Sequence, residues 1–259
     1  MTALVTGAVR GIGAATARHL ARTGIPVALL DVDGDGVAEL ARELAAGGDG
    51  GALALQADVT DAAAVEDAVR RAEDALGPLT RLANVAGVLR TGAVGSLDDA
   101  DWAACLAVNA TGVMHTCRAV ARRWSTDPQS DTGPGRAIVT VASNAAGVPR
   151  AGMAAYAASK AAALAVTRCT GLELAAHGVR ANVVCPGSTD TPMLHGMDLP
   201  ADPEALVAGS PENFKLGIPL GRVADPSDVA GTVAFLLSDA ARHVTLQTLY
   251  VDGGASLGP

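Results

Sequence analysis

The chain alternates short apolar runs with longer Ala-rich stretches, and this alternation restricts its possible folds more than any other feature. Seven runs have the length and composition of buried strands: Ala3–Thr6, Pro26–Asp31, Ala52–Ala57, Arg81–Val85, Arg136–Ala142, Val179–Val184 and Leu246–Val251. The Ala-rich stretches between them favour helices. Strands that alternate with helices in this way form a parallel sheet covered by helices on both faces. The sequence therefore predicts an α/β fold with a doubly wound, seven-stranded parallel sheet.

No linker or internal repeat divides the chain, so residues 1–259 are expected to form a single domain. Two stretches have the composition of loops. The first, Ser125–Gly135, joins a predicted helix to the fifth strand. The second, Gly187–Gly217, is rich in Pro, Gly and Asp and follows the carboxyl end of a strand, where open α/β sheets bind ligands. We therefore expect a substrate lid at about 188–217.

Composition limits the classes of function. Aromatic residues make up only 2% of the chain, so the core must consist mainly of Ala, Val and Leu. A net charge of −8 disfavours binding to nucleic acids or anionic membranes. No apolar run approaches the ~18 residues that span a bilayer. Since no secretory signal precedes Ala3, we expect a cytoplasmic protein.

The cysteines lie in apolar segments and form neither a CxxC pair nor a Cys/His cluster: Cys105, Cys117, Cys169 and Cys185. This pattern predicts free, buried thiols in a reducing compartment rather than disulfides. It also predicts that the protein holds no metal ion.

The first strand continues into the sequence TGAVRGIG, which ends at Gly13 and opens a helical stretch. Glycines at this point permit a tight turn and let the backbone approach a pyrophosphate, which the N-terminus of the following helix also attracts. The loop therefore predicts a dinucleotide cofactor on a Rossmann-type fold. The cofactor-binding residues expected here are Gly7, Val9, Arg10, Gly11, Ile12 and Gly13.

Asp31 ends the second predicted strand, and Val32 follows it. A carboxylate at this place accepts hydrogen bonds from the ribose of adenosine and repels a 2′-phosphate. Asp31 therefore predicts NAD rather than NADP. Arg10 favours NADP instead, since a basic side chain in the glycine loop can bind a phosphate. The alternative is that Asp31 only caps a helix or a turn.

Ser143, Tyr156 and Lys160 suit proton transfer to or from an alcohol. Tyr156 and Lys160 are four positions apart in a helix-favouring stretch, so they share one helical face. Ser143 follows the fifth predicted strand. A nearby ammonium stabilises a phenolate and so lowers the pKa of the tyrosine toward the operating pH. The alternative is a surface Tyr and Lys beside a loop Ser.

Asn109 lies in apolar surroundings within the predicted helix 100–123. The sequence favours a hydrogen-bonded core residue there over a kink that holds water. Polar or small residues also follow the third and fourth strands, at Asp58-Val59 and Asn84–Gly87. These segments lie where strand ends meet a ligand in such folds, although each could be a simple turn.

Taken together, these motifs resemble the short-chain dehydrogenase/reductase family over nearly the whole chain: TGAVRGIG at 6–13, NVAG at 84–87, Asn109, Ser143, Tyr156-x-x-x-Lys160 and Pro186-Gly187. The resemblance implies that Tyr156 is the general acid/base. It implies that Lys160 lowers the pKa of that tyrosine and holds the nicotinamide ribose. It further implies that Ser143 steadies the substrate oxygen and that Asn109 anchors a water in a proton relay.

The same resemblance implies further cofactor contacts at Asp58, Val59, Asn84, Ala86, Gly87, Pro186, Gly187, Thr189 and Thr191. Position 85, usually Asn in the family, is Val here. The resemblance also implies a homotetramer, built on the Ala-rich helices 101–123 and 154–177 and on the C-terminal segment.

Longer strings, such as GVLR at 87–90 and GVPRAGMAAY at 147–156, resemble members of the family that aromatise cyclohexadiene diol carboxylates in siderophore and related secondary metabolism. A carboxylate substrate requires a cation, and Arg90 and Arg150 are the candidates. Met153 and Met193 are candidates for an apolar wall against the ring. The alternatives are solvent-facing arginines and core-filling methionines.

Two other functions remain open. One is a dehydrogenase of the same fold that acts on the amino analogue dihydro-3-hydroxyanthranilate or on another cyclic alcohol, because fold and motif do not separate such substrates. The other is a non-catalytic NAD(H)-binding sensor that has kept the fold.

Overall fold

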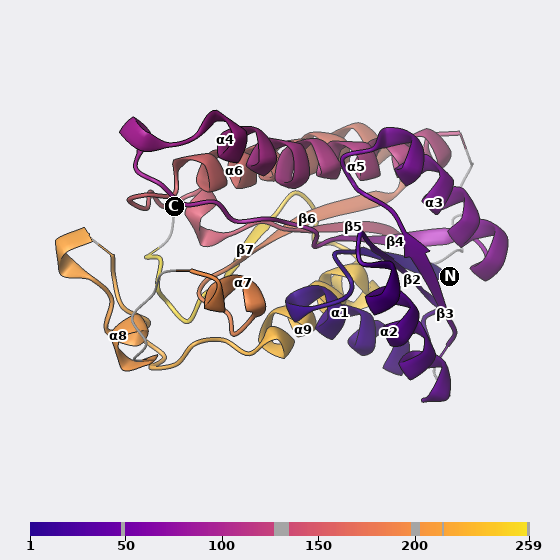
Figure 1. Cartoon of the computed structure of the whole chain (residues 1–259). Coiled ribbons are helices and arrows are strands. Elements are labelled where there is room, and N and C mark those ends of the chain that lie inside the picture. The colour runs from indigo at the N-terminus through magenta and orange to yellow at the C-terminus, as the bar shows by residue number, and fades with distance from the viewer. Residues whose placement is uncertain (48–49, 127–134, 198–202, 214, 258–259) are drawn as a thin grey trace.

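A seven-stranded, entirely parallel sheet forms the centre of the molecule (Figure 1). The computed structural model describes residues 1–47, 50–126, 135–197, 203–213 and 215–257. The strand order is β3-β2-β1-β4-β5-β6-β7. The strands are β1 (Thr2–Thr6), β2 (Val27–Asp31), β3 (Ala52–Gln56), β4 (Leu79–Asn84), β5 (Arg136–Val141), β6 (Val179–Pro186) and β7 (Thr248–Val251). Each predicted run is therefore a strand, with ends that shift by one or two residues.

Helices cover both faces of the sheet, which confirms the doubly wound α/β prediction (Figure 1). One face carries α1 (Gly11–Arg22), α2 (Gly34–Ala46) and α9 (Pro226–Leu237). The other carries α3 (Ala62–Leu76), α4 (Asp99–Cys105), α5 (Gly112–Trp124) and α6 (Ala154–Leu174). The short helices α7 (Pro192–His195) and α8 (Pro203–Ala208) lie beyond the carboxyl ends of the strands (Figure 1).

The core consists of two apolar layers, one on each side of the sheet. In β1, Ala3 and Val5 face the layer under α1, α2 and α9, whereas Leu4 faces the layer under α3, α5 and α6. Alternation along each strand thus supplies both layers at once, as expected for a sheet buried on both faces. Most of the buried apolar residues are Ala, Val and Leu, as the composition predicts.

All four cysteines are free thiols. Cys105, Cys117 and Cys185 are buried, but Cys169 is exposed. The prediction of burial is wrong for Cys169 because α6 buries its Ala163, Thr167 and Gly171 face, and position 169 lies on the opposite side.

Trp102 and Leu172 are also exposed on α4 and α6. A homotetramer built on these helices stays a prediction. Within the described chain, no helix is both long and apolar enough to cross a membrane.

The predicted loop 125–135 lies mostly outside the described residues, since 127–134 are not described. The predicted lid contains α7, α8 and the 3₁₀ turn Pro211–Asn213, and its residues 198–202 and 214 are likewise outside the description. The described parts of this segment contact the body of the protein. Asp190 N donates to Ala224 O at 2.8 Å, and Val207 O accepts from Ile218 N at 2.8 Å.

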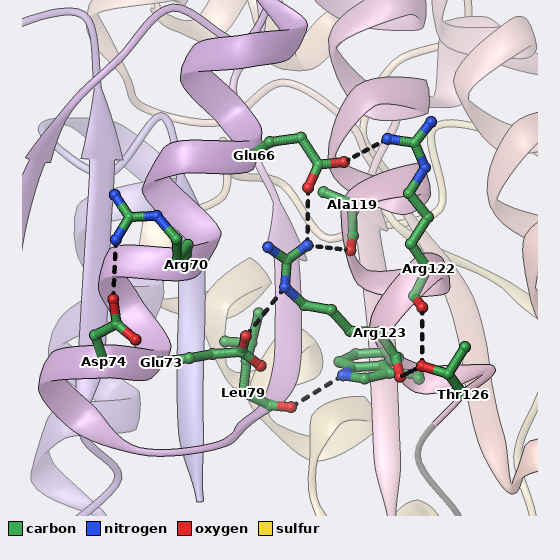
Figure 2. A network of polar contacts seen from close by, with 10 residues as sticks. Glu66, Arg70, Glu73, Asp74, Leu79, Ala119, Arg122, Arg123 and Thr126 are labelled. Carbon is green, nitrogen blue, oxygen red and sulfur yellow. Dashed lines mark hydrogen bonds and ion pairs between the residues drawn. The ribbon is translucent and has the colours of Figure 1, made fainter.

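A polar network fastens α5 to α3 (Figure 2). The Arg123 guanidinium donates to Glu66 at 2.9 Å and to Glu73 at 3.0 Å, and Arg122 reaches Glu66 at 3.0 Å. The buried Trp124 donates its indole N–H to Leu79 O at 3.0 Å. These contacts fix α5 against α3 and the start of β4, and α5 continues from the segment that carries Asn109.

Candidate active site

The glycine loop lies where the order of the sheet reverses, between β1 and β4. Ligands of open α/β sheets bind in the crevice at such a point. Gly7 and Gly11 have φ values of +64° and +54°, which only glycine adopts readily. A Cβ on Gly13 would lie 1.9 Å from Gly7 O, so α1 approaches the loop too closely for any side chain. Thr6 Oγ1 accepts from the Val85 and Ala86 amides at 3.0 and 3.1 Å and joins this loop to the end of β4.

The N-terminus of α1 is open to an anion. In the described chain, the N-cap Arg10 makes no capping hydrogen bond and the first turn carries no acidic residue. The first amides of the helix, including that of Ile12, are therefore available to a pyrophosphate. Thr191, at the start of α7, lies over the loop, because a Cβ on Gly11 would come within 2.9 Å of its methyl group.

The segment after β6 leads from the sheet to Thr191. A Cβ on Gly187 would lie 2.6 Å from Asp252 Cβ, so only glycine fits after Pro186. Thr189 Oγ1 donates to Gly187 O at 3.1 Å and holds the turn. The lid segment thus begins in direct contact with the glycine loop.

Asp31 occupies the place expected for a ribose-binding carboxylate. Its Oδ2 accepts from Val9 N at 3.2 Å, and its Oδ1 accepts from Asp33 N at 3.2 Å. The carboxylate is therefore held between the glycine loop and the start of α2. Val32 is exposed beside it. Arg10 forms an ion pair with Asp33 at 3.1 Å.

Two other predicted contacts lie at the ends of β3 and β4. Asp58 is exposed and its Oδ1 accepts from Thr60 N at 2.8 Å, while Val59 is buried. The Asn84 amide is buried, donates to Thr140 Oγ1 at 3.2 Å and accepts from Thr116 Oγ1 at 2.7 Å. The Asn84 side chain therefore belongs to the core, and the predicted contact of this residue with a cofactor would be made by its backbone.

Asn109 lies in a π-helical segment, Leu106–Thr111, where one continuous helix was predicted. Its amide is fully buried, accepts from Val88 N at 2.8 Å, and donates to Val88 O at 2.9 Å. It also donates to Ser159 Oγ at 2.9 Å, and Ser159 in turn donates to Tyr156 O at 2.7 Å. Asn109 is therefore a hydrogen-bonded core residue in a distorted helix, a common distortion at functional sites. The sequence reasoning missed Ser159, because a serine within a helix carries no signal of its own.

Ser143, Tyr156 and Lys160 lie in one buried cluster. Their exposed fractions are 8%, 8% and 4%. Ser143 Oγ accepts from Ala145 N at 3.1 Å, and the Ser143 side chain acts on Tyr156 to lower the pKa of its phenol. Lys160 Nζ donates to Val141 O at 2.9 Å and lies 5.8 Å from the centre of the Tyr156 ring. A Cβ on Gly87 would lie 3.1 Å from Lys160 Nζ, so the glycine at the end of NVAG leaves room at this ammonium.

Burial dominates the protonation of this cluster. It raises the pKa of Tyr156 to about 12, although the Ser143 side chain opposes the rise. It lowers the pKa of Lys160 to about 8. The sequence predicted that Lys160 lowers the pKa of Tyr156. In this structure burial outweighs any such effect, because desolvation disfavours the charged form of both groups.

An apolar wall adjoins Tyr156. Tyr156 packs with Cys105, Ala145 and Ala155, and the partly buried Leu89, Leu97 and Met153 pack against this cluster. Met153 thus packs near the tyrosine, whereas Met193 is exposed on α7, and a role of either residue against a substrate ring stays a prediction. The sequence reasoning missed Leu89 and Leu97, because they stand in a loop without periodicity.

The two candidate arginines differ. Arg90 forms an ion pair with Asp101 at 3.1 Å and is largely exposed, so its guanidinium already has a carboxylate. Arg150 is half-buried, and this burial lowers its pKa while Asp252 opposes the shift. Lys215, from the lid segment, has a pKa that is lowered by burial and then by the positive charge of Arg150. The two partly buried cations therefore lie within electrostatic range of each other, and an anionic ligand near them would relieve their repulsion.

These residues fit a dinucleotide. The glycine cradle has no room for side chains, the N-terminus of α1 offers amides to a pyrophosphate, and Asp31 offers a carboxylate to a ribose. Lys160 donates only one of its three N–H groups to the protein in the described chain, which leaves donors for a ligand hydroxyl.

Known proteins resemble this chain in sequence and in fold. A family model described as enoyl-(acyl carrier protein) reductase matches residues 7–256. The 2,3-dihydro-2,3-dihydroxybenzoate dehydrogenase of Bacillus subtilis (strain 168) is 48% identical over 259 residues, which cover 99% of this chain and 96% of the relative. A short-chain type dehydrogenase/reductase from Mycobacterium marinum matches with a TM-score of 0.87 at 31% identity, over 99% of this chain and 96% of that chain. A 3-ketoacyl-(acyl-carrier-protein) reductase from Brucella melitensis, solved in complex with NADH, matches with a TM-score of 0.84 at 31% identity, over 98% of each chain.

The matches extend over nearly the whole chain, including the glycine loop and the Ser143, Tyr156 and Lys160 cluster. Together with the dinucleotide-shaped site, they support a nicotinamide cofactor. The chain therefore belongs to the short-chain dehydrogenase/reductase family.

Proposed function

We propose that the protein oxidises 2,3-dihydro-2,3-dihydroxybenzoate to 2,3-dihydroxybenzoate with NAD. The observation that carries the proposal is the 48% identity, over 99% of the chain, to a dehydrogenase named for that substrate. The buried cluster of Ser143, Tyr156 and Lys160 supports it, since it suits proton transfer at an alcohol. The product is a catechol carboxylate of the kind used in siderophores.

In this proposal Tyr156, as phenolate, takes the proton of the ring hydroxyl, while Ser143 donates a hydrogen bond to the same oxygen. The bound nicotinamide supplies the hydride acceptor for the carbinol carbon. The resulting keto-diene loses a ring proton and regains it on oxygen, which gives the aromatic diol. Lys160 would hold the nicotinamide ribose, and its positive charge would stabilise the phenolate against the effect of burial. Asn109 holds the Val88 backbone beside this cluster.

NAD is the proposed cofactor because of Asp31. Its carboxylate accepts hydrogen bonds from the Val9 and Asp33 amides, which hold it beside the glycine loop. A 2′-phosphate would bring negative charge close to this carboxylate, so NADP is disfavoured.

The substrate carboxylate is proposed to bind Arg150 and Lys215. Both cations are partly buried, and each has a lowered pKa. A carboxylate between them would be paired twice, and such charge-assisted hydrogen bonds are among the stronger ones. Arg90 is the weaker candidate, because its guanidinium already forms an ion pair with Asp101.

Arg150→Ala is therefore expected to raise the KM for the diol acid by about 10–100-fold, the value of one charge-assisted hydrogen bond. The KM for NAD should change less than about threefold, since Arg150 lies outside the glycine loop. Steady-state kinetics with each substrate varied in turn measure both values. Arg42→Ala, on the exposed side of α2, is the matched control and should leave both constants unchanged. An Arg150→Ala enzyme with an unaltered KM for the acid would contradict the assignment.

A substrate panel tests the function itself. The wild-type protein with NAD is expected to form NADH from 2,3-dihydro-2,3-dihydroxybenzoate far faster than from the matching diol without a carboxyl group. Absorbance at the NADH band follows the reaction, and mass spectrometry identifies 2,3-dihydroxybenzoate. Faster turnover of dihydro-3-hydroxyanthranilate would shift the assignment to the amino analogue. Absence of NADH formation with every cyclic alcohol would favour the non-catalytic sensor.

A further inference from the structure

The N-terminal end of α2 carries a second carboxylate beside the expected ribose site. Asp33 Oδ1 accepts from Gly36 N at 3.0 Å and caps α2. Its Oδ2 accepts from Arg10 Nη2 at 3.1 Å. The backbone N–H of the same Asp33 donates to Asp31 Oδ1 at 3.2 Å. Asp33 therefore contacts both the carboxylate that favours NAD and the arginine of the glycine loop.

Arg10 is the residue in this region that would favour a 2′-phosphate. It stands in the loop that faces the cofactor, and its side chain is 63% exposed, so it can turn toward a ligand. A guanidinium binds phosphate through two parallel hydrogen bonds. An unpaired Arg10 would therefore offset part of the repulsion that Asp31 exerts on NADP. The observed ion pair opposes this, because a guanidinium that turned to a phosphate would lose its contact with the Asp33 carboxylate.

We propose that Asp33 is a second determinant of cofactor specificity, which acts by pairing with Arg10 and so withholding it from a 2′-phosphate. Asp31 excludes NADP directly, and Asp33 excludes it through another residue, which makes Asp33 a positioning residue. The inference rests on the proposed function, since it presupposes that the wild-type protein binds NAD.

Asp33→Asn removes the negative charge of this side chain and keeps its size and shape. Asparagine caps helices as well as aspartate does, so the bond to Gly36 N and the start of α2 are kept. The readout is equilibrium binding of NADH and NADPH, followed by nucleotide fluorescence, in the absence of substrate. Adenosine 2′,5′-bisphosphate, titrated by calorimetry, is a second probe that carries the 2′-phosphate without the nicotinamide.

Asp33→Asn is expected to tighten NADPH binding about tenfold, the effect of one partly exposed charge-assisted hydrogen bond. Adenosine 2′,5′-bisphosphate should follow the same trend. NADH binding should change less than about threefold, because NADH carries no 2′-phosphate for Arg10 to bind. Arg10→Gln alone should not tighten NADPH binding, since it removes the cation that a 2′-phosphate could bind.

The double variant Arg10→Gln/Asp33→Asn distinguishes an effect through Arg10 from direct repulsion by Asp33. In the Arg10→Gln background, Asp33→Asn should change NADPH binding less than about threefold, because the liberated cation is missing. Equal tightening in both backgrounds would overturn the proposal and indicate direct repulsion by Asp33. Unchanged NADPH binding in Asp33→Asn would also overturn it. A wild-type protein that binds neither nucleotide, or prefers NADPH, would instead refute the proposed NAD dependence.

Discussion

Tyr156→Phe is expected to lower kcat by about 10²–10⁴-fold, the range that a positioned general acid or base contributes. The substitution removes one hydroxyl from a ring that is 8% exposed and packed against Cys105, Ala145 and Ala155. The ring itself stays, so the apolar wall is preserved. Single-turnover and steady-state kinetics on 2,3-dihydro-2,3-dihydroxybenzoate measure the loss.

NADH binding should persist in this variant, because the glycine cradle and Asp31 lie in other elements. Tyr250→Phe makes the same chemical change on β7 and is the matched control, with kcat expected to stay within about threefold of wild type. Near-normal turnover by Tyr156→Phe would remove Tyr156 from its proposed role. Loss of NADH binding together with activity would indicate a structural defect instead.

Lys160→Met is expected to abolish most activity and yet stabilise the protein without ligand. The lysine is buried, and burial lowers its pKa from 10.5 to about 8. Keeping it charged at pH 7 costs the folded state about 3 kcal/mol by the linkage between pKa and stability. The variant loses the hydrogen bond to Val141 O, which offsets about 1 kcal/mol. A net gain of about 2 kcal/mol at pH 7 follows, measured by urea unfolding.

The pH dependence of this gain has a fixed sign. The pKa of Lys160 is about 8 in the folded state and 10.5 as the reference for the unfolded state. Between these values the unfolded wild-type chain binds more protons, so this lysine makes wild-type stability rise with pH. The advantage of Lys160→Met should therefore shrink from pH 8 to 10.5. Arg42→Met, at an exposed position, should change the free energy of unfolding by less than ~0.5 kcal/mol at either pH. A Lys160→Met protein that is less stable than wild type at pH 7 would contradict this account.

The expected loss of activity and the expected gain in stability of Lys160→Met would show that this lysine serves function at a cost in stability. In the proposed function, Lys160 contacts a cofactor ribose and a phenolate, and the fold buries this lysine where its charge is desolvated. Buried groups with shifted pKa values are expected at functional sites, where a feature that destabilises the fold is retained because catalysis needs it.

The sheet could be predicted from the sequence because the patterns that mark its strands are local. Each strand is a short apolar run between helix-forming stretches, and the period of two along β1 supplies both core layers without reference to distant residues. The interruption of the helix at Leu106–Thr111 was not recovered, because nothing in its local sequence requires a π-helix. Asn109 is satisfied there by Val88 and Ser159, which are distant in sequence.

The sequence by itself determined the doubly wound fold and the residue types that a nicotinamide-dependent oxidoreductase requires, since glycines before a helix and a Tyr and Lys one turn apart follow from local geometry. Only the tertiary structure decided how these groups are paired and how far they are buried. It placed the Asn84 amide in the core and paired Arg90 with Asp101 and Arg10 with Asp33. It also brought Lys215 within electrostatic range of Arg150. It also made burial the dominant influence on the pKa of Tyr156 and Lys160. The reason is physical: a hydrogen bond, an ion pair or a desolvation energy depends on which distant segments meet, and that is settled only when the sheet and its helices pack.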